Sequence, residues 1–218
     1  MDTVNEKIEK YKQLAVKKPK YYALIGDLYM DEADFVNAAV YYKKAIDNGV
    51  SVYEKLGETF DYRHQYKKAF DAYMKGAEKG ESGCFASVAY CYQNGHAVKK
   101  DLQKAIEYYE KASDFGAALA ARNLGDLYYF ETPIKENETE NIKNALKFYE
   151  RAFYLGDIQV AKKIGFIYLN DETLQDVQKA IEWYEKGLSL GDYSLNFDLA
   201  YVYLNDRFVP SDYEKGLN

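Results

Sequence analysis

Few residues in this sequence have the types and spacing that chemistry requires. The two histidines, His64 and His96, both fall in short segments between expected helices. A metal site needs several His, Cys, Asp or Glu ligands that converge from fixed elements. Neither histidine has such a residue at ligand spacing in a second fixed element, so the sequence predicts no metal site.

The two cysteines, Cys84 and Cys91, are seven residues apart within one expected helix. That separation corresponds to about 10 Å along the helix axis, which is beyond the reach of a disulfide. Both cysteines occupy positions that hold apolar residues elsewhere in the chain. We therefore expect two buried free thiols that act as small apolar packing groups.

A third group that could carry chemistry is acidic. Glu136, Glu138 and Glu140 lie in the segment ETPIKENETEN at 131–141, which we expect to be an exposed, mobile loop. General acid–base catalysis needs carboxyl groups held in position, and such a loop does not hold them. The sequence also lacks a glycine-rich phosphate loop and a nucleophile beside a histidine at a tight turn. It therefore predicts no catalytic residues and no cofactor, and an enzyme would require a separate domain.

What the sequence carries instead is a repeat, clearest at 101–128. Four residues there mark one helix face and its end, at offsets of 0, 4, 7 and 11: Ala105, Tyr109, Ala112 and Gly116. The same pattern, which is typical of a helix closed by glycine, returns from the origins Ala38, Ala69, Ala145 and Ala180. Four positions before most origins stands a residue suited to a helix N-cap: Asp34, Asp101, Asn141 and Asp176. Gln65, at the same position before Ala69, is the weak exception.

The other helix of each repeat comes first in the chain and is organised on one small residue. These central residues are Gly26, Gly57, Ala89, Gly125, Gly165 and Ala200. Each follows an aliphatic residue and precedes an aromatic residue by three positions. Small residues let two helix backbones approach closely while the tyrosines fill the remaining gaps. Each repeat is therefore expected to be a pair of packed helices.

Repeats of this kind stack into one continuous core, so we expect a single elongated, all-α domain without a disulfide or a β-sheet. A charged helix at 4–18, ended by Pro19, is interpreted as an amino-terminal cap within residues 1–19. The repeat domain then spans 20–218. It comprises five full repeats, at 20–49, 50–80, 81–116, 117–156 and 157–191, and a partial sixth at 192–218, in which Asp212 and Gly216 would begin a further helix.

Charge and hydropathy indicate the class of partner and the compartment of the protein. The 218-residue chain has a formal net charge of −6, with acidic and basic residues interleaved. This balance argues against nucleic acid as the main partner, because phosphate backbones select basic surfaces. No segment approaches the roughly 18 apolar residues of a membrane span, and the amino terminus is charged where a signal peptide is apolar. We expect a cytoplasmic protein.

The repeats resemble a known family. The stretches FYERAFYLGDIQVAKKIGFIYL and IEWYEKGLSLGD, together with 101–128, are similar to Sel1-like repeats, which are relatives of the tetratricopeptide repeat. The short turns of the first two repeats resemble tetratricopeptide spacing more closely. The resemblance implies a right-handed α/α solenoid of stacked antiparallel helix pairs. It also implies a scaffold or adaptor that binds proteins or peptides on its concave face, without catalysis.

Helix periodicity then selects candidate binding residues. We take the packed face of each first helix to carry offsets −1, +2 and +3 from its central residue. Offsets −3, +1 and +4 then point to the opposite side of the helix. The family resemblance implies that this side is the concave face of the solenoid. The candidate protein-binding residues taken from it are Asp27, Glu54, Glu58, Asp61, Tyr90, Arg122, Asp126, Tyr129, Lys162, Phe166, Phe197 and Tyr201. The alternative is that a tightly curved solenoid buries some of them between repeats.

This surface runs from acidic to aromatic, so a bound peptide is expected to be basic at one end and aromatic or aliphatic at the other. The position after each central residue never holds the asparagine that a carboxylate clamp needs, so a free carboxyl terminus is not expected to dock. A second function stays open. The chain could be a regulatory or oligomerisation segment of a longer protein whose activity lies beyond residue 218, with self-association through the partial sixth repeat.

Overall fold

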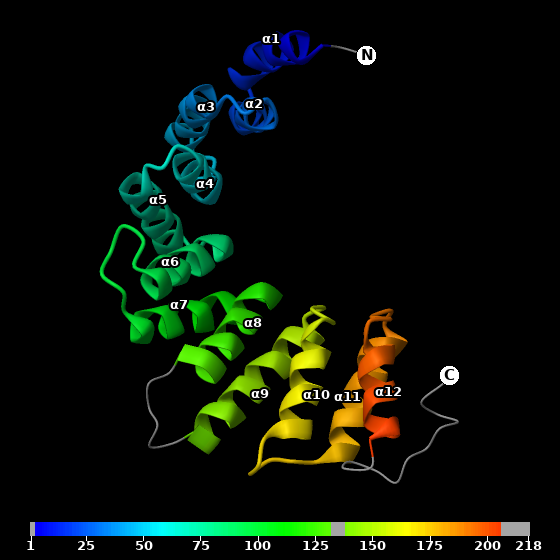
Figure 1. Cartoon of the computed structure of the whole chain (residues 1–218). Helices are drawn as coiled ribbons and strands as arrows, with labels where there is room; N and C mark the ends of the chain where they lie inside the picture. Colours follow the sequence, from blue (N-terminus) through cyan, green and yellow to red (C-terminus); the bar gives the residue numbers. More distant parts are fainter. Residues whose placement is uncertain (1–2, 132–137, 206–218) are drawn as a thin grey trace. The chain divides into compact units, whose positions relative to one another are not determined.

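The computed structural model describes residues 3–131 and 138–205, and all regular elements in these ranges are helical (Figure 1). The all-α prediction is therefore confirmed. The chain divides into two compact units, Met1–Phe115 and Gly116–Asn218, and we describe each by itself. The helix expected at Asp212 and Gly216, and residues 132–137 of the acidic segment, lie outside the described residues.

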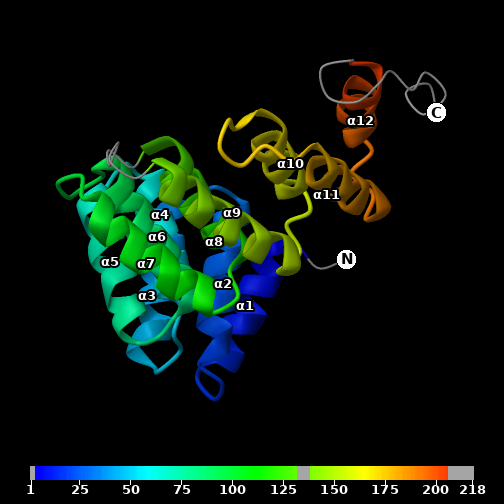
Figure 2. The ribbon, with the colours of Figure 1, turned by 90° about the horizontal axis from the view of Figure 1, so that it is seen from below.

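The first unit contains seven helices among its described residues. They are α1 (Val4–Ala15), α2 (Lys20–Asp31), α3 (Phe35–Asp47), α4 (Tyr53–Tyr62), α5 (Tyr66–Glu78), α6 (Ser82–Asn94) and α7 (Leu102–Asp114). Consecutive helices pack on one another (Figures 1 and 2). Since short turns join α2 to α3 and α4 to α5, these are antiparallel helix pairs.

The second unit continues the same arrangement. Its elements are α8 (Ala118–Asp126), the π-helical segment η1 (Leu127–Glu131), α9 (Glu138–Tyr154), α10 (Val160–Asn170), α11 (Val177–Ser189) and α12 (Leu195–Leu204). Helix α8 packs on α9, α10 packs on α11, and α12 packs on α11. The sequence did not predict η1, in which one turn of α8 widens before the chain leaves the helix.

In four helix pairs a tyrosine ring lies directly on the central glycine of the first helix. A Cβ atom added to Gly125 would lie 2.6 Å from the ring of Tyr149, and the glycines of three other pairs meet tyrosine rings equally closely. Those pairs are Gly26 with Tyr42, Gly57 with Tyr73 and Gly165 with Tyr184. All four rings are buried. The sequence predicted that two helix backbones meet at these glycines, but the nearest neighbour of each glycine is the ring of a tyrosine.

The predicted N-caps are confirmed at three helices and wrong at one. The carboxylates of Asp34, Asp101 and Asp176 accept hydrogen bonds from backbone amides in the first turns of α3, α7 and α11. Helix α9 does not begin after Asn141 but at Glu138. Its first turn carries Glu138 and Glu140, whose negative charge is favourable at the positive end of the helix dipole. Part of the expected loop is therefore helix.

The second helices end in one way and the first helices in several, since the first helix α6 ends at Gly95 in the left-handed region. The second helices end at glycines with positive φ, such as Gly49 at 83° and Gly191 at 102°, as the repeat pattern predicted. The first helices α2 and α4 close through Ala33 and His64, both at φ 56°. No glycine in the sequence marks these left-handed turns.

The amino-terminal helix and the cysteines follow the predictions in most respects. Helix α1 ends at Ala15, earlier than the expected 4–18, and buries Ile8 in a cluster with Ile25. Its role as a cap stays a prediction. Cys84 and Cys91 are both free and buried in α6, which confirms the predicted packing thiols, and burial raises the pKa of Cys91 to about 12.

Candidate protein-binding surface

The candidate residues lie on the first helix of every pair, as the offsets predicted. In the first unit, α2 carries Asp27, α4 carries the other three acids and α6 carries Tyr90. In the second unit, α8, η1, α10 and α12 carry the remaining candidates: Arg122, Asp126, Tyr129, Lys162, Phe166, Phe197 and Tyr201. Their contacts separate them into paired charges, unpaired acids and exposed rings.

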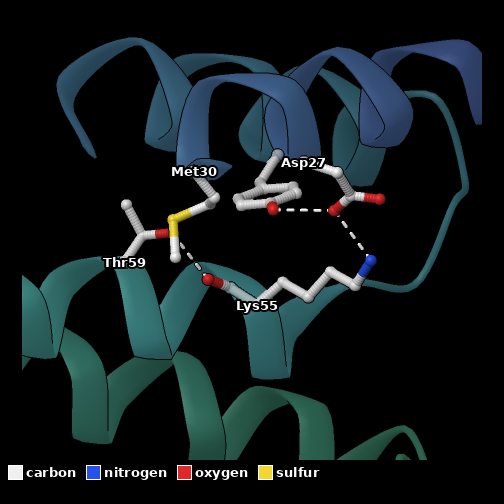
Figure 3. Close-up of polar contacts among 5 residues, drawn as sticks. Asp27, Met30, Lys55 and Thr59 are labelled. Carbon is white, nitrogen blue, oxygen red and sulfur yellow. Dashed lines mark hydrogen bonds and ion pairs between the residues drawn. The ribbon is translucent and has the colours of Figure 1, made fainter. Parts of the chain in front are cut away.

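Asp27 joins three helices. Its Oδ1 atom accepts a hydrogen bond from the hydroxyl of Tyr42 in α3 at 2.8 Å and another from Nζ of Lys55 in α4 at 2.7 Å (Figure 3). Burial, and then the bond to Asp27, raises the pKa of the Tyr42 hydroxyl, so it stays a donor. The carboxylate thus links one repeat to the next. In the same region, the hydroxyl of Thr59 lies 3.3 Å from the sulfur of Met30 (Figure 3).

The same arrangement recurs in the second unit. Oδ1 of Asp126 accepts from the hydroxyl of Tyr149 at 2.6 Å and from Nζ of Lys163 at 2.7 Å. We call these two sets the Asp–Tyr–Lys ties. They favour a role for Asp27 and Asp126 in joining repeats, while their predicted contact with a partner stays a prediction.

Sequence reasoning missed these ties although a signal was present. Lysine stands two positions before the next central residue, at Lys55 and Lys163, only where aspartate follows the preceding one. The repeats without that aspartate have Ser87, Asn123 or Asp198 in the lysine position. The correlation joins residues in different repeats, which an analysis of offsets within one repeat does not compare.

The two candidate cations of the second unit are also paired. Arg122 contacts Asp157 at 3.1 Å, and Lys162 contacts Asp198 at 2.8 Å. Lys162 is exposed, and a surface ion pair of this kind contributes about 0–1 kcal/mol, whereas both side chains of the Arg122–Asp157 pair are partly buried. The main consequence of both pairs is that the second unit supplies its own counterions.

The acids of α4 are different. Burial raises the pKa of Glu54, Glu58 and Asp61, and the neighbouring charges of Glu81 and Glu54 add to the shifts of Glu54 and Glu58 respectively. Asp61 accepts a hydrogen bond from the Tyr73 hydroxyl at 2.7 Å. Within the described residues Glu58 forms no ion pair. Lys55 and His96 offset part of this negative charge, but Glu58 keeps no direct ion-pair partner in the part of the chain that the structure describes.

Aromatic candidates complete the surface. Phe166, Phe197 and Tyr201 have 52%, 82% and 57% of their surface exposed. Tyr90 is also exposed, whereas Tyr129 is half-buried and meets Phe130 edge to face. Exposed rings on regular helices cost hydration free energy, and they are common anchors in protein interfaces.

The same repeat pattern appears in known proteins. The Sel1 repeat model matches residues 86–114, 118–157, 161–192 and 196–218, which together make up more than half of the chain. The chain is a member of the Sel1 repeat family. A tetratricopeptide repeat model matches residues 19–48, in agreement with the tighter first repeat. Both family predictions are confirmed. Proteins built from Sel1 and tetratricopeptide repeats are typically non-catalytic scaffolds.

Solved structures of Sel1 and tetratricopeptide repeat proteins are similar to this chain. A Sel1 repeat protein from Oxalobacter formigenes is 25% identical, with a TM-score of 0.71 over 93% of this chain and 86% of that protein. The protective antigen c5321 of uropathogenic Escherichia coli is 21% identical, with a TM-score of 0.76 over 96% of this chain and 47% of that one. YrrB, a tetratricopeptide repeat protein with an unusual peptide-binding site, is 17% identical, with a TM-score of 0.53 over 86% of this chain and 96% of its own.

One curated relative is similar over part of its length. Alpha-soluble NSF attachment protein from Vitis vinifera is 29% identical over 181 residues, which cover 77% of this chain and 63% of the plant protein. The chain thus spans less than two thirds of that relative. Among the helices of the described residues, none combines the length and the apolar character of a membrane-spanning helix.

Proposed function

We propose that this Sel1 repeat protein is a scaffold that binds a protein or peptide segment through the first helices of its repeats. The fold generally mediates protein–protein interaction. The observation that carries the proposal is the exposure of Phe166, Phe197 and Tyr201 while the tyrosines of the repeat core are buried. Exposed rings at regular spacing supply large contact area at low entropic cost, which suits them as anchors.

The two units would select different parts of a partner. In the first unit the clustered acids of α4 favour a basic segment, because attraction between opposite charges speeds association and selects the partner. In the second unit the cations are already paired, so the exposed rings favour aromatic or aliphatic side chains. The Asp–Tyr–Lys ties and the Arg122 and Lys162 pairs would hold these faces in place.

This proposal includes a non-catalytic role and a cytoplasmic protein partner rather than nucleic acid. A second function is supported by the exposure of Phe197 and Tyr201 on α12, the last described helix. These rings would suit self-association through the partial sixth repeat, within a regulatory or oligomerisation segment of a longer protein. In that case the chain itself would be its own partner.

Peptide selection on the intact chain tests the proposal. Selected peptides should carry basic residues together with aromatic or aliphatic residues, and fluorescence anisotropy should show that Phe166→Ala raises their off-rate at every salt concentration. Tyr193→Ala is the matched control, since Tyr193 is also exposed in the second unit but lies between helices. Equal effects of both changes would refute the face assignment. Sedimentation showing dimers that Phe197→Ser dissociates would favour the self-association function instead.

A further inference from the structure

The turn between α4 and α5 borders a hollow that the sequence did not indicate. Its volume is about 650 Å³, and its lining comprises Met30, Glu58, Asp61, Tyr62, His64 and Tyr66. The lining comes from three helices and one turn of the first unit. It combines two carboxylates with aromatic rings and a thioether, and this combination is suited to a cationic group with an apolar stem.

The aromatic walls are held by their neighbours. The ring of Tyr62 stacks on Phe35, with ring centroids 4.9 Å apart and planes 4° from parallel. The hydroxyl of Tyr66 lies 3.0 Å from Nδ1 of His64, and its ring lies 5.8 Å from that of His96. Both tyrosines nevertheless remain exposed, at 61% and 45%. Rings that are fixed before a ligand arrives lose less entropy on binding.

The carboxylates of the hollow lie on one face of α4, three positions apart. The Tyr73 hydroxyl bonds to Oδ2 of Asp61, which leaves Oδ1 without a hydrogen bond among the described residues. Glu58 forms no ion pair in the same part of the chain. Lys55, on the same helix, donates to Asp27 instead. A cation entering the hollow would therefore meet two carboxylates with free acceptor capacity.

Glu58 has no lysine partner from the next repeat, unlike the aspartates at the equivalent position of two other repeats. Asp27 and Asp126, which follow the central glycines of their repeats, each bind a lysine of the next repeat. Glu58 occupies the same position after Gly57, but the next repeat has Ser87 where the others have lysine. The chain thus supplies the counterion at two equivalent positions and omits it at the third.

We propose that this hollow binds the side chain of an arginine presented by the partner protein. The inference deepens the proposed scaffold function and rests on it. A guanidinium group is planar, so it can lie against a tyrosine ring while it donates hydrogen bonds to a carboxylate, and an ammonium group cannot do both equally well. The methylene stem of the arginine would contact Met30.

The test uses the intact, isotopically labelled chain and three small probes followed by NMR. N-acetylarginine methylamide should shift the amide resonances of 58–66 in a saturable way. N-acetylcitrulline methylamide has the same shape without the charge and should leave them unchanged, and the lysine analogue should bind several-fold more weakly. Equal shifts from citrulline, equal affinity for lysine, or arginine shifts confined to other helices would each overturn the proposal.

Matched variants locate the binding. Glu58→Gln should weaken the arginine probe at least about threefold, as expected for loss of one exposed charge partner, and it removes no hydrogen bond of the described chain. Glu78→Gln makes the same charge change in α5, about 18 Å from Tyr66 along the helix axis, and should leave the affinity unchanged. Tyr66→Leu should weaken binding without abolishing the fold. Equal affinities of the Glu58 and Glu78 variants would refute the assignment.

The outcomes also separate this inference from the scaffold proposal. If the arginine probe fails while selected peptides still bind with dependence on Phe166, the hollow is not an arginine site and the scaffold function stands. If the probe binds in the hollow but no peptide or protein binds the chain, the cation site stands and the scaffold function falls.

Discussion

Helices α4 and α10 occupy the same place in their repeats but present different surfaces. Each is the first helix of a pair and seats a tyrosine ring on its central glycine, Gly57 or Gly165. The position after that glycine is Glu58 in α4, without an ion pair among the described residues, and the exposed Phe166 in α10. The positions that pack in the core are the same in both helices, whereas the residue that follows the central glycine differs.

The difference extends to the neighbouring charges. Lys162 and Lys163 in α10 are both paired, with Asp198 and Asp126. The acids of α4 instead crowd together, and burial raises the pKa of each. A surface that keeps like charges partly buried gives up stability, which is understandable if a partner supplies the opposite charge. The same repeat frame thus carries an acidic face in α4 and an exposed aromatic ring in α10.

The largest effect should come from the shared core. Gly57→Val and Gly165→Val should each lower the free energy of unfolding by about 1–3 kcal/mol or more, because the added branches collide with a tyrosine ring. Hydrogen exchange in each unit would measure the loss locally. If one variant is harmless, the two helices do not share the packing that the comparison assumes.

A smaller effect should distinguish the position after the glycine. Asp126→Asn should destabilise the second unit by about 1–2 kcal/mol, since the buried Tyr149 hydroxyl and Lys163 lose a charged acceptor. Glu58→Gln should not destabilise the first unit. Denaturant unfolding with local probes measures both. Equal losses at the two sites would show that Glu58 also has a structural role.

The pH dependence should differ between the two helices in a predictable direction. In α4 the folded-state pKa of Glu54, Glu58 and Asp61 is raised, so the folded chain binds more protons than the unfolded chain. The stability that these three groups contribute to the free energy of unfolding is therefore fully present below the unfolded carboxyl pKa of about 4. It is lost as the pH rises through the folded-state pKa values.

The double variant Glu54→Gln/Glu58→Gln isolates this contribution. Compared with the parent chain, the variant should lose less stability between about pH 4 and neutral pH. Thermal unfolding of the first unit at several pH values measures the difference. An unchanged pH slope would show that solvent screens these acids fully.

Much of this architecture could be predicted because its signals are local. Gly116 and the caps Asp101 and Asp176 act within one helical turn of the residues that they satisfy, so offsets along the chain contain the information. The recurrence of Gly125 and Tyr149 at equivalent positions of the repeats predicted a tightly packed helix pair, although not the direct contact of the ring with the glycine.

The features that the sequence did not predict also share a cause. The tie at Asp126 joins three helices, and the hollow beside Tyr66 depends on how a turn and three helices meet. Neither is visible in the periodicity of one helix. The early start of α9 at Glu138 was missed because the surrounding acidic composition is typical of a loop.

The smallest predicted effect concerns the turns of the first unit. Ala33 and His64 hold φ at 56°, where a Cβ atom is unfavourable. Ala33→Gly and His64→Gly should each raise the free energy of unfolding by about 0.5–1 kcal/mol, the relief of strain exceeding the added entropy of the unfolded chain. Chemical denaturation measures this gain.

The paired turn variants also separate stability from recognition, since only one of the two residues lines the hollow. His64→Gly removes the ring that contacts the Tyr66 hydroxyl, so the ring of Tyr66 loses a neighbour that holds it. It should weaken the arginine probe, whereas Ala33→Gly should leave its affinity unchanged. If both variants gain stability and neither changes the affinity, the walls of the hollow do not need His64. The contrast between the acidic and aromatic faces would then rest on the carboxylates of α4 alone.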